Sequence, residues 1–274
     1  MKQLLALLII TFAISSCKDS SKAVESVADS VKDASKTVMA STTEEASIGN
    51  GLTIKAFTES VAFPDASIST MNYTNGVFTF GLRGDTYELG QQSPDAESKM
   101  CANSGKGQHI HLIVNDSPYA AKYVKQFTHD IPDGDHHVLA FLSRSYHESI
   151  KSNGANVAVK VNVKDKSITS TEAIKDPMLF YSRPKGTYVG KDTKNLMLDF
   201  FIKNVNLSGS GYKVKASING TETIISKWQP YYLNGLPMGE NTITLTLIDK
   251  DGNKVDAPLN PVSRTFTLKA DPLG

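Results

Sequence analysis

The chain has 274 residues, of which 40% are hydrophobic, and its net charge is +1. This composition is typical of a globular protein long enough for two domains. Without a basic excess, we expect no nucleic-acid partner.

The N-terminus has the pattern of a secretory signal. Lys2 precedes an apolar run from Leu4 to Ile14, which is followed by Ser15, Ser16 and Cys17. The run is too short to span a bilayer, which takes about 20 apolar residues, but it has the charged and apolar regions of a signal peptide. We therefore predict a signal peptide over residues 1–16, and no later apolar run spans a membrane.

Ile14-Ser15-Ser16-Cys17 resembles the lipobox of bacterial lipoproteins. The resemblance implies that Cys17 is lipidated and that the N-terminal lipid holds the protein on a membrane of the cell envelope, expected to be the outer membrane. Lys18-Asp19 also looks like the export signal of surface-exposed lipoproteins, so the periplasmic and the surface face both remain open. With Cys17 lipidated, Cys101 has no intramolecular partner and a disulfide framework is excluded.

Residues 17–50 are predicted to form a polar tether. This segment is rich in Ser, Lys, Asp and Glu and has no aromatic residue. Alternating spacings of three and four residues between apolar positions would line one face of a loose helix. The positions are Val24, Val27, Val31, Ala34 and Val38.

The remainder of the chain reads as a tandem repeat. The alignment places 63–68 over 183–188, 77–84 over 197–204, 107–115 over 211–219, and 133–142 over 238–247, with about sixteen extra residues between 84 and 107 in the first copy. Each copy consists of short alternating stretches separated by Asn-Gly, Asp-Gly and Pro turns. This pattern predicts an all-β fold of two tandem β-sandwiches, 51–170 and 171–274, with an inserted loop at about 88–106.

The second copy also resembles an immunoglobulin-like or fibronectin-like module. The resemblance rests on LNGLPMGENTITLTLIDKDGNKV (233–255), which looks like the strand-turn-strand ending of such modules in bacterial surface proteins. The Cys…Trp…Cys pattern of true immunoglobulin domains is absent, so the resemblance implies architecture and not function.

The two copies differ on one predicted sheet face. In the predicted strand the core-facing side chains are those of Ile110, Leu112 and Val114. The side chains of His109 and His111 alternate with them and therefore point to the outer face of the sheet. On the partner strand His137 takes the outer phase with Leu139 and Phe141, whereas the second copy has Lys, Ser and Thr at outer positions.

Three interpretations of this half-apolar face are open. The face is covered by the other domain, the tether or the inserted loop; or it is a metal site; or it binds an organic or anionic ligand. In the metal interpretation His109, His111 and His137 bind copper or zinc. Met100 or Cys101 of the inserted loop then acts as a soft fourth ligand, which favours copper.

The ligand interpretation rests on polar side chains that follow the second strand. Ser143, Arg144, Ser145, Tyr146 and His147 crowd the strand end. Such donors suit phosphate or carboxylate groups, although a solvated loop with one aromatic plug explains them equally well.

Two further resemblances concern the same region. GQHIHLIVND looks like the His-x-His strand of copper-zinc superoxide dismutases, a match that reaches only His109 and His111. Residues 70–165 are similar to uncharacterised envelope lipoproteins with a His-bearing strand, some of them labelled phosphopeptide-binding. That label would imply Ser-x-x-His, but Arg144 lies three residues before His147.

We therefore expect a lipid-anchored envelope binding or interaction protein with an envelope protein or peptide as its partner. The alternatives are a phosphopeptide-binding module, a purely structural assembly module, and a dismutase-like metalloenzyme. No common catalytic motif is present in the sequence, so enzymatic activity is an open question.

Overall fold

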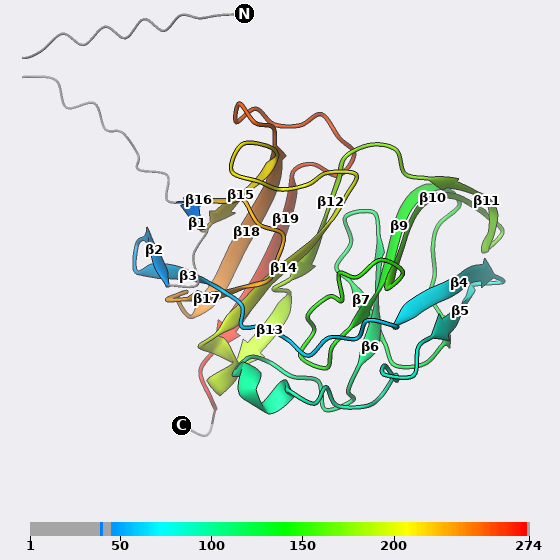
Figure 1. Ribbon diagram of the computed structural model, residues 1–274, viewed down its shortest axis with the longest axis horizontal. Helices are drawn as coiled ribbons and strands as arrows, with labels where there is room; N and C mark the ends of the chain where they lie inside the picture. The colour runs from blue at the N-terminus through cyan, green and yellow to red at the C-terminus, as the bar shows by residue number, and fades with distance from the viewer. Residues whose placement is uncertain (1–38, 41–44, 273–274) are drawn as a thin grey trace, which may run out of the picture. The chain divides into compact units, whose positions relative to one another are not determined.

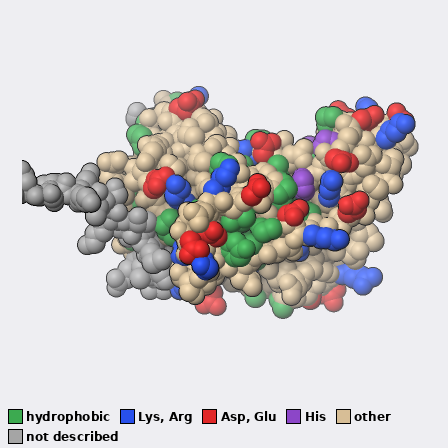
Figure 2. All heavy atoms as spheres, turned by 90° about the horizontal axis from the view of Figure 1, so that it is seen from above, with side chains coloured by type: hydrophobic (Ala, Val, Ile, Leu, Met, Phe, Trp, Pro, Cys, Tyr) green, Lys and Arg blue, Asp and Glu red, His purple; other side chains and the backbone are tan. Residues whose placement is uncertain are grey.

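The computed structural model describes residues 39–40 and 45–272, and within them the fold is all β, as predicted (Figure 1). The helical elements there are two 3-10 turns, η1 (Ala96–Lys99) and η2 (Gly190–Thr193). No helix in this part of the chain has the length and apolar character needed to cross a membrane. Acidic and basic side chains are interspersed over the face seen in Figure 2. The predicted signal peptide, Cys17 and most of the tether lie outside the described residues.

The first sandwich has a five-stranded and a three-stranded sheet. The larger sheet has the order β11 (Ser167–Ala173), β10 (Asn156–Lys164), β9 (Gly134–Ser143), β6 (His109–Val114) and β7 (Ala120–Lys122). The smaller sheet has the order β4 (Ser67–Thr74), β5 (Val77–Arg83) and β8 (Gln126–Thr128). Alternate residues of β5, β6 and β9 fill the core, including Phe78, Ile110 and Leu142.

The second sandwich has a five-stranded and a six-stranded sheet. The five-stranded sheet has the order β12 (Met178–Arg183), β14 (Leu196–Lys203), β17 (Tyr231–Asn234), β3 (Leu52–Ala56) and β2 (Ala46–Gly49). The six-stranded sheet has the order β1 (Met39–Ala40), β16 (Thr221–Ile225), β15 (Lys213–Ile218), β18 (Gly239–Ile248), β19 (Val262–Lys269) and β13 (Gly186–Val189). Their inner faces form a large aliphatic and aromatic core.

The predicted repeat is present in the pairing of the central strands. In the first sandwich Ile110 of β6 pairs with Leu142 of β9. In the second, the aligned residues Val214 of β15 and Leu247 of β18 pair in the same register. The predicted core phase is also confirmed, because these residues are fully buried in the cores of their sandwiches.

The segment before the first sandwich belongs to the second one. Residues 46–49 fall within the range predicted as tether, but they form strand β2, and Ile48 is part of the second core. Strand β3 falls within the range predicted for the first sandwich, but it pairs with β17 of the second. The backbone at Gly235, which follows β17, comes very close to the backbone at Gly51, which precedes β3. Position 235 requires glycine, because a Cβ there would overlap the carbonyl oxygen of Gly51. The prediction missed this pairing because local patterning does not specify which sheet a strand joins.

The outer face of the β6–β9 sheet is covered and not solvated. Ile113, Leu139 and Phe141 pack in one cluster with Met178, Phe180 and Phe201 from the outer face of β12 and β14. A buried carboxylate adds a polar link, because Asp199 of β14 accepts hydrogen bonds from the Ser149 backbone N–H at 3.0 Å and from Lys151 Nζ at 2.7 Å. The expectation that the outer strand phase points to solvent is therefore wrong, and the interpretation of a face covered by the other domain is the one observed.

Candidate metal centre

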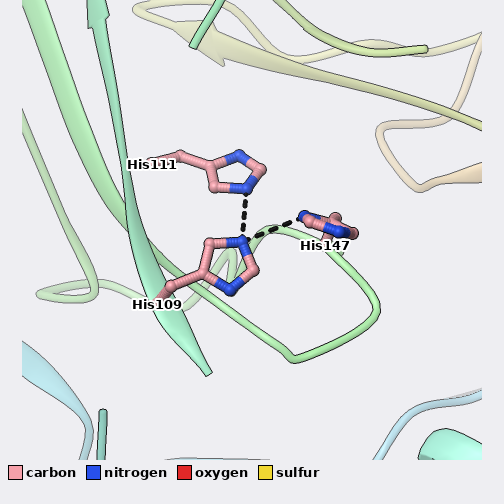
Figure 3. A group of neighbouring side chains, drawn as sticks. All are labelled: His109, His111 and His147. Atoms are coloured by element: carbon pink, nitrogen blue, oxygen red, sulfur yellow. Dashed lines mark hydrogen bonds between the residues drawn. The ribbon is translucent and has the colours of Figure 1, made fainter. Parts of the chain in front are cut away.

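Three imidazoles meet at the edge of the covered face. His109 and His111 project from β6, and His147 reaches them from the loop that follows β9 (Figure 3). His109 Nε2 lies 2.8 Å from His111 Nε2 and 3.0 Å from His147 Nδ1. One ring nitrogen from each residue falls within 4.8 Å of the other two. Three nitrogen donors therefore converge on a single point.

The protonation of His109 is set by the inserted loop. His109 Nδ1 lies 2.8 Å from the carbonyl oxygen of Gly107, so Nδ1 carries the proton and donates it. This leaves Nε2 with a lone pair directed at the other two rings, as required of a metal ligand. Gly107 has a φ of +81°, and a Cβ there would overlap the carbonyl of Gly90, so this close crossing of the loop requires glycine.

His111 is held between aromatic rings in the interior. The Tyr119 ring stacks on it with centroids 3.6 Å apart and an interplanar angle of 7°, and the Phe141 ring lies 4.9 Å away. Its Nδ1 is 3.5 Å from Ser182 Oγ of β12. The second sandwich thus supplies a polar neighbour for the ring nitrogen that faces away from the cluster.

His147 occupies a left-handed backbone position. Its φ is +71°, and its backbone N–H donates to the carbonyl of Arg144 at 2.9 Å. This turn folds the chain back over the sheet and directs Nδ1 at His109. The residue is partly exposed, whereas His109 and His111 are fully buried. His147 is therefore the member of the cluster nearest to solvent.

Burial keeps all three rings neutral. It lowers the pKa of His109 to about 4 and the pKa values of His111 and His147 well below the usual range, and the positive charge of Arg183 lowers them further. At neutral pH protons therefore do not compete for the ligand nitrogens. Burial also raises the pKa of Tyr119 to about 12, so this phenol stays protonated.

His137 is not part of the cluster, and its assignment as a ligand is wrong. The antiparallel register pairs His111 with Phe141 and Ile113 with Leu139, which puts His137 beyond the end of this pairing. A separation of four residues along a strand amounts to about 14 Å. Strand alternation correctly predicted the sheet face on which His137 lies. The observed register, however, puts His137 at the opposite end of the β6–β9 pair from His109.

Met100 and Cys101 are also separate from the three imidazoles. Met100 is 74% exposed, and the carbonyl of Met100 accepts a hydrogen bond from Asn195 Nδ2. Cys101 borders a pocket of about 440 Å³ with Lys191 and Asp192 on the second sandwich, and burial raises the pKa of its thiol to about 11. The part of the inserted loop that borders the histidines is residues 104–107, where Ser104 Oγ contacts the hydroxyl of Tyr123 and Tyr123 packs on His109.

The polar residues after β9 are engaged within the protein. Ser143 donates to the carbonyls of Arg144 and Glu148. Arg144 donates to the Val61 carbonyl and pairs with Glu148 at 3.5 Å, and the Tyr146 hydroxyl donates to Asp95 at 3.0 Å. The alternative of a solvated loop is not observed, because these residues are buried or, for His147, partly buried, and of the five residues in this group only His147 faces the cluster.

A comparison with protein-family models finds no match to this chain. A comparison with curated proteins finds no relative. Among solved structures, the chain is similar to fibronectin(III)-like modules of Clostridium thermocellum CbhA, with 18% identity, 34% of this chain and 99% of that chain covered, and a TM-score of 0.26. It is also similar to domains 4 and 5 of the S-layer protein SbsC, with 12% identity, coverage of 75% and 100%, and a TM-score of 0.20. These likenesses concern the β fold alone.

Proposed function

We propose that this protein is a metal-binding protein of the cell envelope that holds one copper or zinc ion between His109, His111 and His147. The observation that carries the proposal is the convergence of three neutral imidazole nitrogens within 4.8 Å of one another. Histidine imidazole is a preferred ligand of both metals. Three protein ligands leave a coordination position open for water or another group.

The spacing of the nitrogens supports binding after a local rearrangement of the three rings. Metal–nitrogen bonds of about 2.0–2.1 Å in tetrahedral geometry place two ligand nitrogens about 3.3 Å apart. The two short separations, 2.8 and 3.0 Å, are hydrogen-bond distances and would open by a few tenths of an ångström, while the third separation, which is within 4.8 Å, would have to close toward the same value. On binding, His111 would move its proton from Nε2 to Nδ1, next to Ser182 Oγ, and His147 would move its proton from Nδ1 to Nε2.

The charges around the centre favour monovalent copper. The positive charges of Arg183 and Lys185 lower the pKa values of both His111 and His147. A dication among neutral ligands and cationic neighbours would be costly to bury, and a monovalent ion costs less. Copper(I) combines this single charge with affinity for imidazole, so we rank it ahead of zinc.

The expected location adds biological context to the proposal. The lipobox-like Ile14-Ser15-Ser16-Cys17 supports lipidation of Cys17 and attachment to an envelope membrane, most simply the outer membrane. There the two sandwiches would present the centre for storage, delivery or sensing of the ion. An envelope protein that exchanges the metal is the partner class that fits this role.

The test is metal binding by the full chain, with Cu(I) under anaerobic reducing conditions and Zn(II) as probes. We expect one ion per chain, and we expect His109→Ala and His147→Asn each to weaken affinity at least 100-fold. Asparagine tolerates the left-handed backbone at position 147, so that variant removes the ligand with little strain. Thermal unfolding of each metal-free variant checks that it is folded.

His137→Ala is the matched control, because His137 lies on the same sheet face but away from the cluster. Its affinity should stay within twofold of the wild type. The proposal fails if the wild-type chain binds neither ion stoichiometrically, or if the control and the ligand variants lose affinity equally. In that case the three rings are only a buried hydrogen-bonded group between the sandwiches.

A further inference from the structure

The second sandwich buries two guanidinium groups whose hydrogen-bonding capacity is largely unused. Arg183 at the end of β12 is only 4% exposed, and its Nε and Nη1 have no hydrogen-bond partner. Arg264 of β19 is half-buried, and its Nε and Nη2 also have none. Buried polar groups in proteins are nearly always paired, so four nitrogens without a partner among the protein's own groups mark this edge as a candidate ligand site.

Aromatic rings hold both guanidinium groups in place. Arg183 Cζ lies 5.4 Å from the centroid of the Tyr188 ring, and its Nη2 donates to the Tyr188 hydroxyl at 2.8 Å. Arg264 Cζ lies 5.5 Å from the Tyr181 ring, and its Nη1 donates to the Ser263 carbonyl. One nitrogen of each group is therefore anchored. Arg264 keeps the planar fork of Nε and Nη2 free, whereas Arg183 keeps Nε and Nη1, which donate in different directions.

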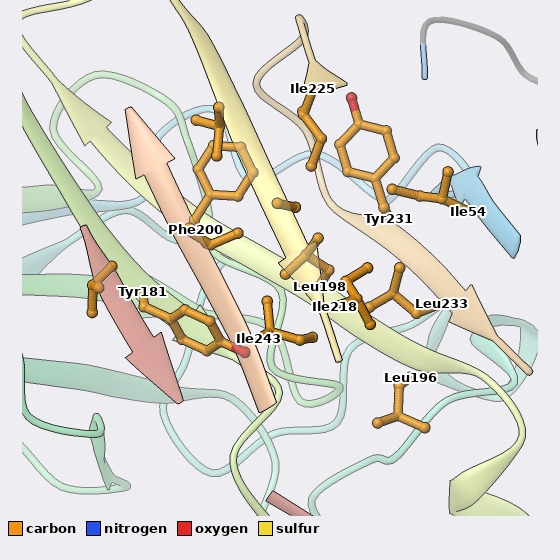
Figure 4. Close-up of a cluster of buried hydrophobic side chains, with 14 of the residues drawn as sticks. Ile54, Tyr181, Leu196, Leu198, Phe200, Ile218, Ile225, Tyr231, Leu233 and Ile243 are labelled. Atoms are coloured by element: carbon orange, nitrogen blue, oxygen red, sulfur yellow. The ribbon is translucent and has the colours of Figure 1, made fainter. Parts of the chain in front are cut away.

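A fifth unpaired polar atom belongs to the same edge. Tyr181 lies in the core of the second sandwich (Figure 4), is 1% exposed, and its hydroxyl has no hydrogen-bond partner. The charges of Arg183 and Arg264 both act on this hydroxyl and on the Lys185 amine, and both lower the Lys185 pKa. Arg264 packs on the Tyr181 ring, and Tyr181 precedes Arg183 by two residues on β12, so the three groups share this edge. The acidic group that acts on Arg264 is Asp116.

We propose that Arg183, Arg264 and the Tyr181 hydroxyl form an oxyanion site at the β12–β19 edge of the second sandwich. The ligand carries a carboxylate, phosphate or sulfate group, because guanidinium N–H pairs match the oxygens of such groups. Lys185, whose Nζ sits 4.1 Å from the Tyr119 ring centroid, adds a further positive charge beside the site. This site shares no residue with the histidine cluster or with the Ser143–His147 loop, although it lies close enough for the charge of Arg183 to act on all three histidines.

The experiment titrates the full-length protein with phosphate, sulfate and acetate at constant ionic strength against chloride. Binding is followed by calorimetry and by the shift in the unfolding temperature. We expect saturable, one-to-one binding of at least one oxyanion, and comparison of phosphate with acetate distinguishes a phosphoryl-bearing from a carboxylate-bearing ligand. Arg264→Gln should weaken this binding at least tenfold.

Arg83→Gln is the matched control, since it makes the same charge change at an exposed position of β5 in the first sandwich. It should leave oxyanion affinity within twofold. Because Arg183→Gln would leave a cavity in a fully buried position, Arg183→Lys is the second variant, and loss of the guanidinium fork should weaken binding at preserved charge. His109→Ala should bind the oxyanion normally, which separates this site from the metal centre.

The proposal is overturned if none of the three anions produces a saturable change. It is also overturned if Arg264→Gln and Arg83→Gln reduce binding to the same degree, because the effect would then be general electrostatics. Ordered water would in that case satisfy the five polar atoms.

Discussion

The buried histidine cluster makes the stability of the folded protein depend on pH in a way that exposed histidines would not. His109 and His111 are fully buried, and burial is the largest cause of their lowered pKa values. In the unfolded chain the same residues titrate near the usual pKa. The folded protein therefore takes up fewer protons than the unfolded chain over the interval between the two values.

We predict that the metal-free protein loses stability as the pH falls below about 6.5, the pKa of an unperturbed histidine. For His109 the interval extends from 6.5 down to its folded pKa of about 4. Across it this residue alone lowers the free energy of unfolding by up to about 1.4 kcal/mol per pH unit, and the loss is absent above the interval. Urea unfolding between pH 7.5 and 4.5 measures the slope.

His109→Gln should flatten this dependence, because it removes one titrating group. His137→Gln is the comparison, since His137 is partly exposed and lies outside the buried cluster. An unchanged slope in His109→Gln would show that other groups govern acid unfolding. A bound metal ion should move the loss of stability to lower pH, because the ligand nitrogens must then be protonated against the metal.

The sequence was sufficient to select two of the three clustered histidines. The His-x-His spacing placed His109 and His111 on one strand face, and they do lie together. His147 was identified only as part of an anion-binding group, because its approach depends on a left-handed turn after β9 that no periodicity reports. Arg183 was not identified at all, since a single arginine at a strand end carries no pattern.

At the scale of strands, alternation predicted faces correctly and register only in part. The aligned pairs Ile110–Leu142 and Val214–Leu247 occupy equivalent positions in the two sandwiches. Alternation gives the face of a sheet because side chains point in opposite directions at successive residues. It does not give the distance along the sheet, which is why His137 was wrongly grouped with His111, nor does it tell a solvated face from one covered by another sheet.

The contact between β14 and the loop after β9 depends on one buried carboxylate. Asp199 is fully buried, and its oxygens accept from the Ser149 N–H and from Lys151 Nζ. We predict that Asp199→Asn destabilises the protein by about 3 kcal/mol, because removal of one partner of a buried ion pair leaves the other charge uncompensated. Chemical denaturation of the metal-free chain measures the change.

Asp135→Asn provides the matched substitution in an exposed ion pair. Asp135 lies 3.4 Å from Lys160, and both side chains are largely solvent-accessible. Exposed pairs contribute about 0–1 kcal/mol, so this variant should be close to wild type. Equal effects of the two substitutions would mean that Asp199 does not link the sandwiches energetically.

At the scale of the whole described chain, the two sandwiches do not follow one another simply in sequence. The described chain first contributes β1, β2 and β3 to the second sandwich, then forms the first sandwich, and then returns to complete the second. The tandem repeat remains correct for the central strands. It could not reveal the early strands, because they have no counterpart in the other copy and their pairing with β17 is a non-local contact.

We therefore predict that a chain beginning at Phe57 is unstable although it retains every strand of the first sandwich. The deletion removes Ile48, Leu52 and Ile54 from the second core. Buried aliphatic side chains contribute about 1.5–3 kcal/mol each, so the loss of about 4.5–9 kcal/mol approaches the whole stability of many domains. A chain beginning at Glu45 keeps β2 and β3 and is the control. The urea unfolding midpoints of the two chains are compared, and equal midpoints would show that β3 contributes little to the stability of the second sandwich. A lower midpoint for the chain beginning at Phe57, together with exposure of the Phe141–Phe201 contact, would show instead that β2 and β3 stabilise the interface between the sandwiches next to the histidine cluster.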